Sequence, residues 1–465
     1  MNRIAIVGMA CRYPDAASPQ ELWEIAVDGP RASRWLPDVR MGHWDCISSD
    51  PALPDPFYAH DAAALEGFAS NRTPHTPATT AYRSPDSAFW LARDALGRAF
   101  LDADLPAGEA LARKTISVVI GSTHNGEPSR ANEVRHPWPY ARRLVVGALE
   151  EMGWDNVRIA EFTARLEAHY HRRFPPTGQD TVASGLSNAV AGRICSYYNF
   201  NGGDYSVGEA CSPSLIPVTT AGSVLLSGVA DVVVAGGINL SIDPLEIIEF
   251  ARAGALVKNE MRLYDRYSNG LWRGEGCGMV VLMREEDAIA AGNRIYASIA
   301  GWGISYDDQG DITRPEVSGH HRTLQHAYEQ AGFGIETVPL FEVDGTGTSV
   351  GDSTELTALS QSRAAAGAHT PSAAISSIKG TIGHTKAAAG IAGLIKAAMA
   401  LDAQILPPAM GFTNPGELLT GKRANLRALH GAEAWPAKAP LRAGVSAMGL
   451  GGIKTHVVLE KTEPR

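Results

Sequence analysis

One cysteine stands where a catalytic thiol is expected, between a predicted strand and a predicted helix. Cys211 belongs to the run EACSPSL at 209–215, in which Pro213 suits a first helical turn because its missing N–H leaves no bond unmade. A thiol at a helix start lies near the positive end of the helix dipole, which favours the nucleophilic thiolate. Pro217, deeper in the same predicted helix, should bend or tighten its first turns. A cysteine taken alone is more often a small buried apolar residue, so the rest of the chain must decide.

A histidine and a lysine follow a second predicted strand. The run ISSIKGTIGHTKAAAG at 375–390 has the pattern of a strand, a turn and a helix, and it places His384 at the turn. A histidine there can donate a hydrogen bond to a thioester oxygen or accept a proton near neutral pH. Lys379 is either a buried partner of the site or a solvated strand end. A lone histidine is more often a structural residue, so this segment too needs support from others.

Two glycine-rich segments complete the set. The run FEVDGTGTSVGDS at 341–353 leaves an apolar strand and carries Asp344, which by itself would be a turn residue or a helix cap. The run AMGLGGIKTH at 447–456 offers backbone N–H groups with little steric cover, as an oxyanion hole requires. By itself this motif is weak evidence for a phosphate site, and no strand-loop-helix context supports a dinucleotide fingerprint. Three other histidines are expected to form a solvated helix face rather than a metal site: His320, His321 and His326.

Composition narrows the classes of protein that fit. The 465 residues include 45% hydrophobic and 20% charged residues, typical of an ordinary globular protein, and the net charge of −9 disfavours a nucleic-acid surface. The five cysteines are an odd number without metal-ligand spacing, and no secretory segment precedes them, which favours a reducing cytoplasm. No apolar run approaches the roughly 18 residues of a membrane span.

The positions of these residues follow from an alternation of strands and helices, which predicts an α/β fold. Short β-branched runs that suit strands buried on both faces lie at 4–8, 116–121, 232–237, 279–282, 296–299, 373–378 and 457–460. Alanine-rich helical runs lie between them at 87–101, 319–331, 353–366 and 387–401. We expect two halves, 1–285 with Cys211 and 286–465 with Asp344 and His384, and an irregular surface excursion at about 30–84.

Taken together, these segments resemble the ketosynthases of polyketide and fatty acid synthases, in the same order and over nearly the whole chain. The runs SIDPLEIIEF at 241–250 and YASIAGWGIS at 296–305 are most similar to the branch found in enediyne synthases. The resemblance implies a thiolase fold, five-layered αβαβα from two related halves, and a homodimer. It also implies that the acyl group arrives on the phosphopantetheine arm of an acyl or peptidyl carrier protein, with no cofactor bound to the chain itself.

The same resemblance assigns roles to individual residues. Cys211 would carry the acyl group, and the N–H groups of Cys211 and Leu450 would form the oxyanion hole. His384, Lys379 and Asp344 would complete the catalytic site. The arm would be contacted by Thr346, Thr348, Gly449 and Gly451.

Three positions depart from the family pattern. The family has histidine where this chain has Asp344, a gating phenylalanine where it has Leu450, and usually asparagine where it has Lys454. An elongating ketosynthase uses two histidines to stabilise the enolate that forms when a malonyl thioester loses carbon dioxide. An ionised aspartate offers only acceptors, and a like charge about 4 Å from the enolate would cost about 4 kcal/mol at a dielectric near 20, roughly a thousandfold in rate. A protonated aspartate would restore a donor.

The aspartate therefore favours another use of the acyl thioester. As a general base it would remove the acidic proton beside the thioester carbonyl, leading to intramolecular aldol addition, and the new alkoxide would expel Cys211 as a lactone. A standalone chain of this kind resembles the cyclising enzymes of salinosporamide-type natural-product pathways, which release a γ-lactam-β-lactone from a carrier-bound β-ketoamide thioester. The alternatives are an elongating or iterative β-ketoacyl synthase and a non-catalytic partner like a chain-length factor, which usually lacks the nucleophile.

Overall fold

The computed structural model describes most of the chain, with gaps. The described residues are 3–35, 61–66, 87–105, 115–122, 135, 137–172, 189–208, 214–240, 242, 244–257, 259–307, 315–367, 372–422, 424–449 and 451–461. Cys211 and Leu450, two residues of the predicted site, lie outside these ranges, as does most of the predicted excursion at 30–84. Asp344, Lys379 and His384 lie within them.

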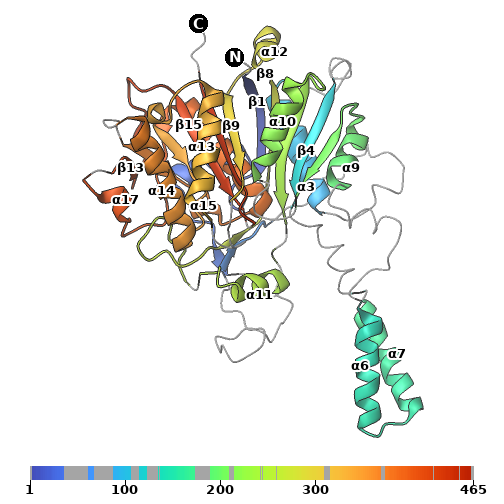
Figure 1. Cartoon of the computed structure of the whole chain (residues 1–465). Helices are drawn as coiled ribbons and strands as arrows, with labels where there is room; N and C mark the ends of the chain where they lie inside the picture. Colours follow the sequence, from blue (N-terminus) through green and yellow to red (C-terminus); the bar gives the residue numbers. More distant parts are fainter. Residues whose placement is uncertain are drawn as a thin grey trace.

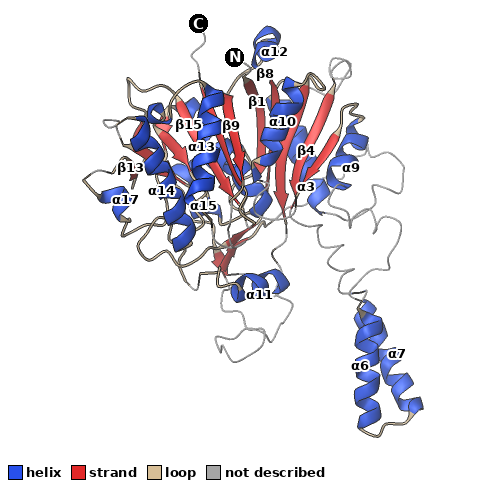
Figure 2. Cartoon of the chain, viewed as in Figure 1, coloured by secondary structure: helices blue, strands red, loops and turns tan. Residues whose placement is uncertain are grey.

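A mixed sheet of 11 strands runs through the described part of the chain (Figure 2). Its spatial order is β13-β11-β10-β15-β16-β9-β1-β8-β6-β4-β5. In chain order the strands are β1 (Ile4–Arg12), β4 (Ile116–Ser122), β5 (Asp204–Val207), β6 (Val232–Asn239), β8 (Gly276–Arg284), β9 (Ala297–Ser305), β10 (Leu340–Glu342), β11 (Ala373–Ser376), β13 (Leu426–Ala428), β15 (Arg442–Met448) and β16 (Lys454–Glu460). Each strand predicted from an apolar run overlaps one of these.

The middle of the sheet joins strands from the earlier and the later part of the chain. Strand β1 pairs antiparallel with β8 on one side and with β9 on the other. Strands β4 and β6 are parallel and buried along their whole length, as their continuous apolar sequences predict. In the later part of the chain β10 is parallel to both β11 and β15, so the carboxyl ends of these three strands meet at one edge. That edge is where the site lies.

Helices cover the strands in three layers. The inner helices α1 (Pro19–Val27), α10 (Ile216–Leu226) and α16 (Ala389–Ala403) share one apolar core with strands from both parts of the sheet. Helices α3 (Ser87–Asp102) and α9 (Ala189–Tyr198) pack outside β1, β4 and β8, and α13 (Val317–Ala331) and α14 (Ser349–Ala366) pack outside the later strands. The alternation of helix and strand layers is that of the thiolase fold, as expected. Residues Ala389–Leu401 of α16 are buried all round, which explains their alanine-rich sequence.

One local expectation about the nucleophile segment is wrong. Helix α10 begins at Ile216, and Pro217 therefore lies in its first turn rather than deeper inside it. A proline there removes an N–H that has no partner within the helix, so it neither bends nor tightens the helix.

Smaller elements complete the described structure. Strands β2 (Arg34–Trp35), β3 (Asp61–Ala63) and β7 (Arg273–Gly274) form a second sheet, and β2 and β3 belong to the described parts of the predicted excursion. Strand β12 (Ile405–Leu406) pairs with β14 (Glu433–Ala434). Helices α6 (Trp138–Glu151) and α7 (Asn156–Arg172) form a hairpin that stands away from the body (Figure 1). The short helices are α11 (Pro244–Arg252), α12 (Glu285–Ala291), α15 (Lys379–Ile382), α17 (Glu417–Thr420), η3 (Ile335–Thr337) and η4 (Lys386–Ala388). No helix in the described ranges is both long and apolar enough to cross a membrane.

Candidate active site

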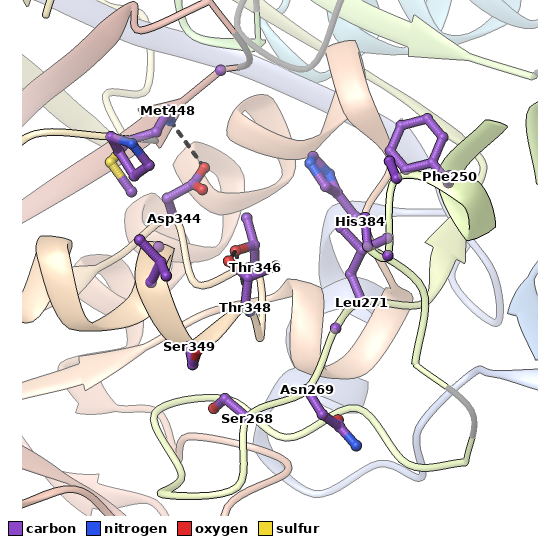
Figure 3. Close-up of a pocket in the computed structure, with 18 of the residues that line it drawn as sticks. Phe250, Ser268, Asn269, Leu271, Asp344, Thr346, Thr348, Ser349, His384 and Met448 are labelled. Atoms are coloured by element: carbon purple, nitrogen blue, oxygen red, sulfur yellow. Dashed lines mark hydrogen bonds between the residues drawn. The ribbon is translucent and has the colours of Figure 1, made fainter. Parts of the chain in front are cut away.

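A cavity of about 700 Å³ at the carboxyl ends of β10 and β15 is lined by several of the predicted residues: Asp344, Thr346, Thr348, His384 and Gly449. Asp344 and Thr346 reach it from the loop after β10, Met448 from the end of β15, and His384 from the segment between α15 and η4. In Figure 3 Asp344 and His384 face the cavity from two sides, with Thr346 between them. Segments far apart in the sequence thus meet around one space.

The two carboxylate oxygens of Asp344 have different surroundings. Oδ1 accepts hydrogen bonds from Lys379 Nζ at 2.5 Å and from the backbone N–H of Met448 at 3.0 Å, the second of which is drawn in Figure 3. Oδ2 is buried and accepts no hydrogen bond from any other residue that the structure describes. The ammonium group and the N–H thus occupy Oδ1. Asp344 therefore presents one tethered oxygen and one that is available as an acceptor.

Two carboxylates of α14 hold the backbone of the loop that carries Asp344. Glu355 accepts the backbone N–H of Asp344 at 2.7 Å and that of Gly345 at 3.1 Å, and Asp352 accepts the N–H of Gly347 at 3.0 Å. Burial, with the nearby Asp344 carboxylate as the next cause, raises the pKa of Glu355. Burial likewise raises the pKa of Asp352, to about 7. These acceptors fix the backbone, and with it the direction of the Asp344 side chain.

Gly345 shows why this loop needs glycine. Its φ of 50° lies in the left-handed region, and a Cβ at this position would lie 2.0 Å from the hydroxyl oxygen of Tyr264. Any larger residue would push the loop away from that buried tyrosine. The first glycine after Asp344 is thus required for the close approach that places the carboxylate.

His384 is held in one tautomer. The backbone N–H of Lys386 donates to its Nδ1 at 3.2 Å, which leaves Nε2 to carry the proton. Burial lowers the pKa of His384 well below its usual value, and the positive charges of Lys379 and Arg273 lower it further. The imidazole is therefore neutral at physiological pH and acts as an Nε2–H donor toward the cavity side of the site.

The backbone on both sides of His384 is tied to β7. His384 donates its N–H to the carbonyl of Trp272 at 2.8 Å, and its own carbonyl accepts the N–H of Gly274 at 3.0 Å. Lys386 adopts a φ of 46°, an unusual conformation for a residue with a side chain, and this conformation accompanies its bond to Nδ1. Strained backbone of this kind persists where the surrounding structure enforces it.

Lys379 is a buried partner of the site rather than a solvated strand end. Its Nζ binds both the carboxylate of Asp344 and, at 2.7 Å, the carbonyl of the same residue. The lysine side chain is 5% exposed and that of Asp344 is 2% exposed, so water screens the pair little. The charge of Lys379 therefore acts on both Asp344 and His384.

Most of the remaining predicted contacts line the same cavity. Thr346 and Thr348 line the cavity, with their hydroxyl oxygens 2.8 Å apart. In the turn between β15 and β16 the residues that line it are Gly449 and Gly452, whereas Gly451 was the second glycine expected from the sequence. Lys454 begins β16 opposite Met448, forms a buried ion pair with Asp307 and donates to the carbonyl of Gly452 at 3.3 Å. The lysine thus braces the turn.

The expectation of a solvated histidine face on α13 is wrong for one residue. His320 is 1% exposed, and burial lowers its pKa to about 3, with help from the charge of Lys454. His321 lies 2.8 Å from the hydroxyl of Ser362, and His326 is exposed. In the part of the chain that the structure describes, no group of three or more His, Cys, Asp or Glu residues is placed to hold a metal ion.

Comparisons with known proteins agree with this architecture. Residues 1–288 match the beta-ketoacyl synthase N-terminal domain, and residues 296–413 match the C-terminal domain. The chain is 31% identical over 472 residues to a polyunsaturated fatty acid synthase of Thraustochytrium sp., a match that covers 100% of this chain and 16% of that protein. It is 29% identical over 471 residues to 5-methyl-1-naphthoate synthase of Streptomyces sahachiroi, covering 99% of this chain and 24% of that protein.

The solved structures extend the likeness to three dimensions. An oxazolomycin ketosynthase domain of Streptomyces albus has a TM-score of 0.82 at 25% identity, covering 100% of this chain and 75% of that one. The chain spans 24% or less of the length of the two curated relatives, the fatty acid synthase and the naphthoate synthase. The sequence matches over both domains and the shared thiolase fold lead to one conclusion: the chain belongs to the beta-ketoacyl synthase family.

Proposed function

We propose that this chain takes an acyl group from a carrier protein onto Cys211 and closes it into a ring instead of lengthening it. The observation that carries the proposal is the difference between the two carboxylate oxygens of Asp344. Oδ1 is bound to Lys379 and Met448, whereas Oδ2 is buried without a hydrogen bond from another described residue. Such an oxygen, on a residue that lines the cavity, is suited to act as a general base.

The same arrangement argues against decarboxylative elongation. That reaction builds negative charge on an enolate oxygen, and the sequence resemblance implies that elongating relatives meet it with two histidine donors. We propose that Asp344, which is tethered by a cation and an N–H, is ionised, and an ionised carboxylate can only accept hydrogen bonds. A second negative charge about 4 Å away would cost about 4 kcal/mol at a dielectric near 20.

The proposed substrate is a β-ketoamide of an amino acid, joined as a thioester to Cys211. Asp344 removes the proton from the carbon beside the thioester carbonyl, and this carbon attacks the distal ketone to close a γ-lactam. The resulting alkoxide attacks the thioester carbonyl, so that a C–O bond forms and the C–S bond breaks. The proton on Asp344 passes to the departing sulfur. Carbon dioxide is not lost, and nothing is oxidised or reduced.

His384 supplies the complementary half of this chemistry. As a neutral imidazole with its proton on Nε2, it donates a hydrogen bond to the oxygen that becomes negative during the aldol and lactone steps. The cavity of about 700 Å³ lies within the roughly 300–1,000 Å³ typical of small-molecule sites, which leaves room for both the arm and a folded acyl group.

Elongation remains the second candidate, because the curated relatives include a polyunsaturated fatty acid synthase and a 5-methyl-1-naphthoate synthase. Malonyl-loaded carrier protein separates the two functions. If the chain ring-closes, it releases no carbon dioxide from that substrate, and prompt release together with a β-keto product would overturn the proposal.

The direct test uses a synthetic β-ketoamide thioester of phosphopantetheine and mass spectrometry of the released product. The wild-type chain should release the bicyclic γ-lactam-β-lactone, Asp344→Ala should carry the acyl group on Cys211 without releasing it, and Cys211→Ala should carry none. Normal turnover by Asp344→Ala would reduce the aspartate to a turn residue. An absence of acylated Cys211 in the wild type would instead favour a non-catalytic partner subunit.

A further inference from the structure

Phe250 forms the cavity wall on the side of His384. It extends from α11 beside the histidine (Figure 3), and the lining residues that follow it in the chain are small: Ala253, Gly254 and Ala255. Phe250 is thus the largest side chain that an acyl group would meet there. Its position decides how much room remains.

Two cations hold the phenyl ring. The guanidinium carbon of Arg273 lies 4.1 Å from the ring centroid, and Nζ of Lys386 lies 5.4 Å from it. Arg273 is 1% exposed, so this cation–π contact is made away from water, where such contacts are strongest. The ring therefore has little freedom to turn away from an incoming acyl group.

Glu246 binds the same two cations from the helix that carries Phe250. Its Oε1 lies 2.5 Å from a terminal nitrogen of Arg273 and also pairs with Lys386. Glu246 and Phe250 are four residues apart on α11, a spacing that places both on one face of the helix. One carboxylate thus fastens α11 to two separate segments of the chain.

Those segments are the ones that hold His384. Arg273 is followed by Gly274, whose N–H donates to the His384 carbonyl. The backbone N–H of Lys386 donates to Nδ1 of His384 and so fixes the imidazole tautomer. The phenyl ring and the imidazole are therefore parts of one buried assembly, defined here as Glu246, Phe250, Arg273, Lys386 and His384. The wall cannot move without disturbing the catalytic donor.

We propose that Phe250 sets the upper size of the acyl group that can be carried beside His384, and that Glu246 is the positioning residue that keeps Phe250 in place. The substrate class is an acyl thioester whose bulk near the thioester is limited by this wall. The proposal rests on acyl transfer to Cys211 and not on ring closure, so it stands or falls separately from the cyclisation chemistry.

The test measures loading of the full chain by intact mass, with N-acetylcysteamine thioesters of butanoate and of 3-cyclohexylpropanoate. The measured quantity is the ratio of the bulky to the small loading rate. Because one methylene in an apolar pocket changes selectivity by roughly 10- to 200-fold, Phe250→Ala should raise this ratio at least about tenfold and Phe250→Trp should lower it. A ratio that stays within about twofold of wild type in both variants would overturn the proposal.

Phe162→Ala is the matched control, because Phe162 lies on α7, outside the residues that line the cavity, and is 40% exposed. It should leave the ratio unchanged, and an equal rise there would remove the assignment to Phe250. If Phe250→Ala does not fold, Phe250→Leu replaces it and should shift the ratio in the same direction.

The role of Glu246 is tested by a double-mutant cycle. Glu246→Gln should raise the ratio less than Phe250→Ala does, and adding it to Phe250→Ala should raise the ratio no further, because both act through one wall. Glu246→Asp should restore part of the discrimination. Independent, additive effects of the two substitutions, or no effect of Glu246→Gln, would show that Glu246 does not position Phe250.

Discussion

Asp344 and His384 line one cavity, but the side chains that lie behind them differ in kind. Behind Asp344 lie the buried carboxylates Asp352 and Glu355, which accept backbone N–H groups of its loop. Behind His384 lie the cations Arg273 and Lys386. The wall of Asp344 presents a hydrogen-bond acceptor on a loop that two further acceptors hold. The wall of His384 presents a hydrogen-bond donor that burial and nearby positive charge keep neutral.

Lys379 connects the two walls. It neutralises Asp344 through a direct ion pair and, after burial, is the largest cause of the lowered pKa of His384. A reaction in which one side of the site removes a proton and the other stabilises an oxyanion needs an acceptor on the first side and a donor on the second. A site with donors on both walls would instead suit an enolate formed by decarboxylation. The comparison therefore predicts which substitutions should exchange one chemistry for the other.

The largest effect should come from Asp344→His, which makes both walls donors. Ring closure should fall by about a thousandfold, because the general base is lost, while release of carbon dioxide from a malonyl-loaded carrier should appear. Product mass spectrometry and a carbon dioxide assay measure the two reactions. Asp344→Asn is the control, since it removes the base without adding an imidazole and should show neither activity. Unchanged ring closure in the histidine variant would mean that the charge on this wall is irrelevant.

Lys379→Met should next break the connection between the walls. Removing one partner of a buried ion pair leaves the other charge unpaired, and the free energy of unfolding should fall by about 3–5 kcal/mol. Urea denaturation measures the loss. The double variant Lys379→Met/Asp344→Asn should recover much of it, because no unpaired charge is then buried. A loss below about 1 kcal/mol would show that the pair is exposed to water in solution.

The apolar and alanine-rich runs of the sequence predicted many of the strands and the helices α3, α13, α14 and α16, because such elements are encoded locally. Continuous apolar runs identified β4 and β6, and glycine next to Asp344 identified the loop. The resemblance brought Asp344, Lys379 and His384 together, and the structure places the first two in direct contact.

The supporting residues could not be found in this way. Glu246 contacts Arg273 and Lys386 only because α11, β7 and η4 converge in space, and no spacing in the sequence encodes that convergence. Glu355 offered a weak signal, since it lies one helical turn after Asp352 on α14. His320 was misjudged because a cluster of histidines looks polar, whereas its place on α13 faces the core.

After Asp344→His and Lys379→Met, the third largest effect should come from His384→Ala. Ring closure should fall by about 100- to 1,000-fold, as expected when one oxyanion donor is removed. His384→Gln, whose side-chain amide can still donate, should lose less. The smaller loss in the glutamine variant follows if His384 acts as a neutral hydrogen-bond donor. In that case the rate of ring closure by the wild type should show no step near pH 6.5 from this residue. Equal losses in both variants, with such a step, would instead make His384 a proton carrier. Acyl loading, measured separately, controls for misfolding.

The smallest effect should appear in the pH dependence of stability of Glu355→Gln. The folded pKa of Glu355 is raised above its ordinary 4.5, so its contribution to stability is complete below pH 4.5 and is lost as pH rises toward the folded pKa. The Glu355→Gln variant has no titrating carboxyl at this position, so it does not lose this stability as pH rises. Its stability relative to wild type should therefore increase between pH 5 and 7, by at most about 1.4 kcal/mol per pH unit. A flat difference in urea denaturation would contradict the raised pKa.

The same measurement tests the charge on Asp344, on which the contrast between the walls depends. The Asp344 carboxylate is, after burial, the largest cause that raises the pKa of Glu355. If Asp344 is ionised, the slope attributable to Glu355 should shrink in an Asp344→Asn background, because the repelling charge is gone. If Asp344 is protonated, the substitution removes no charge and the slope should stay the same. The second outcome would leave Asp344 a donor, and both walls of the cavity would then serve the chemistry of elongation.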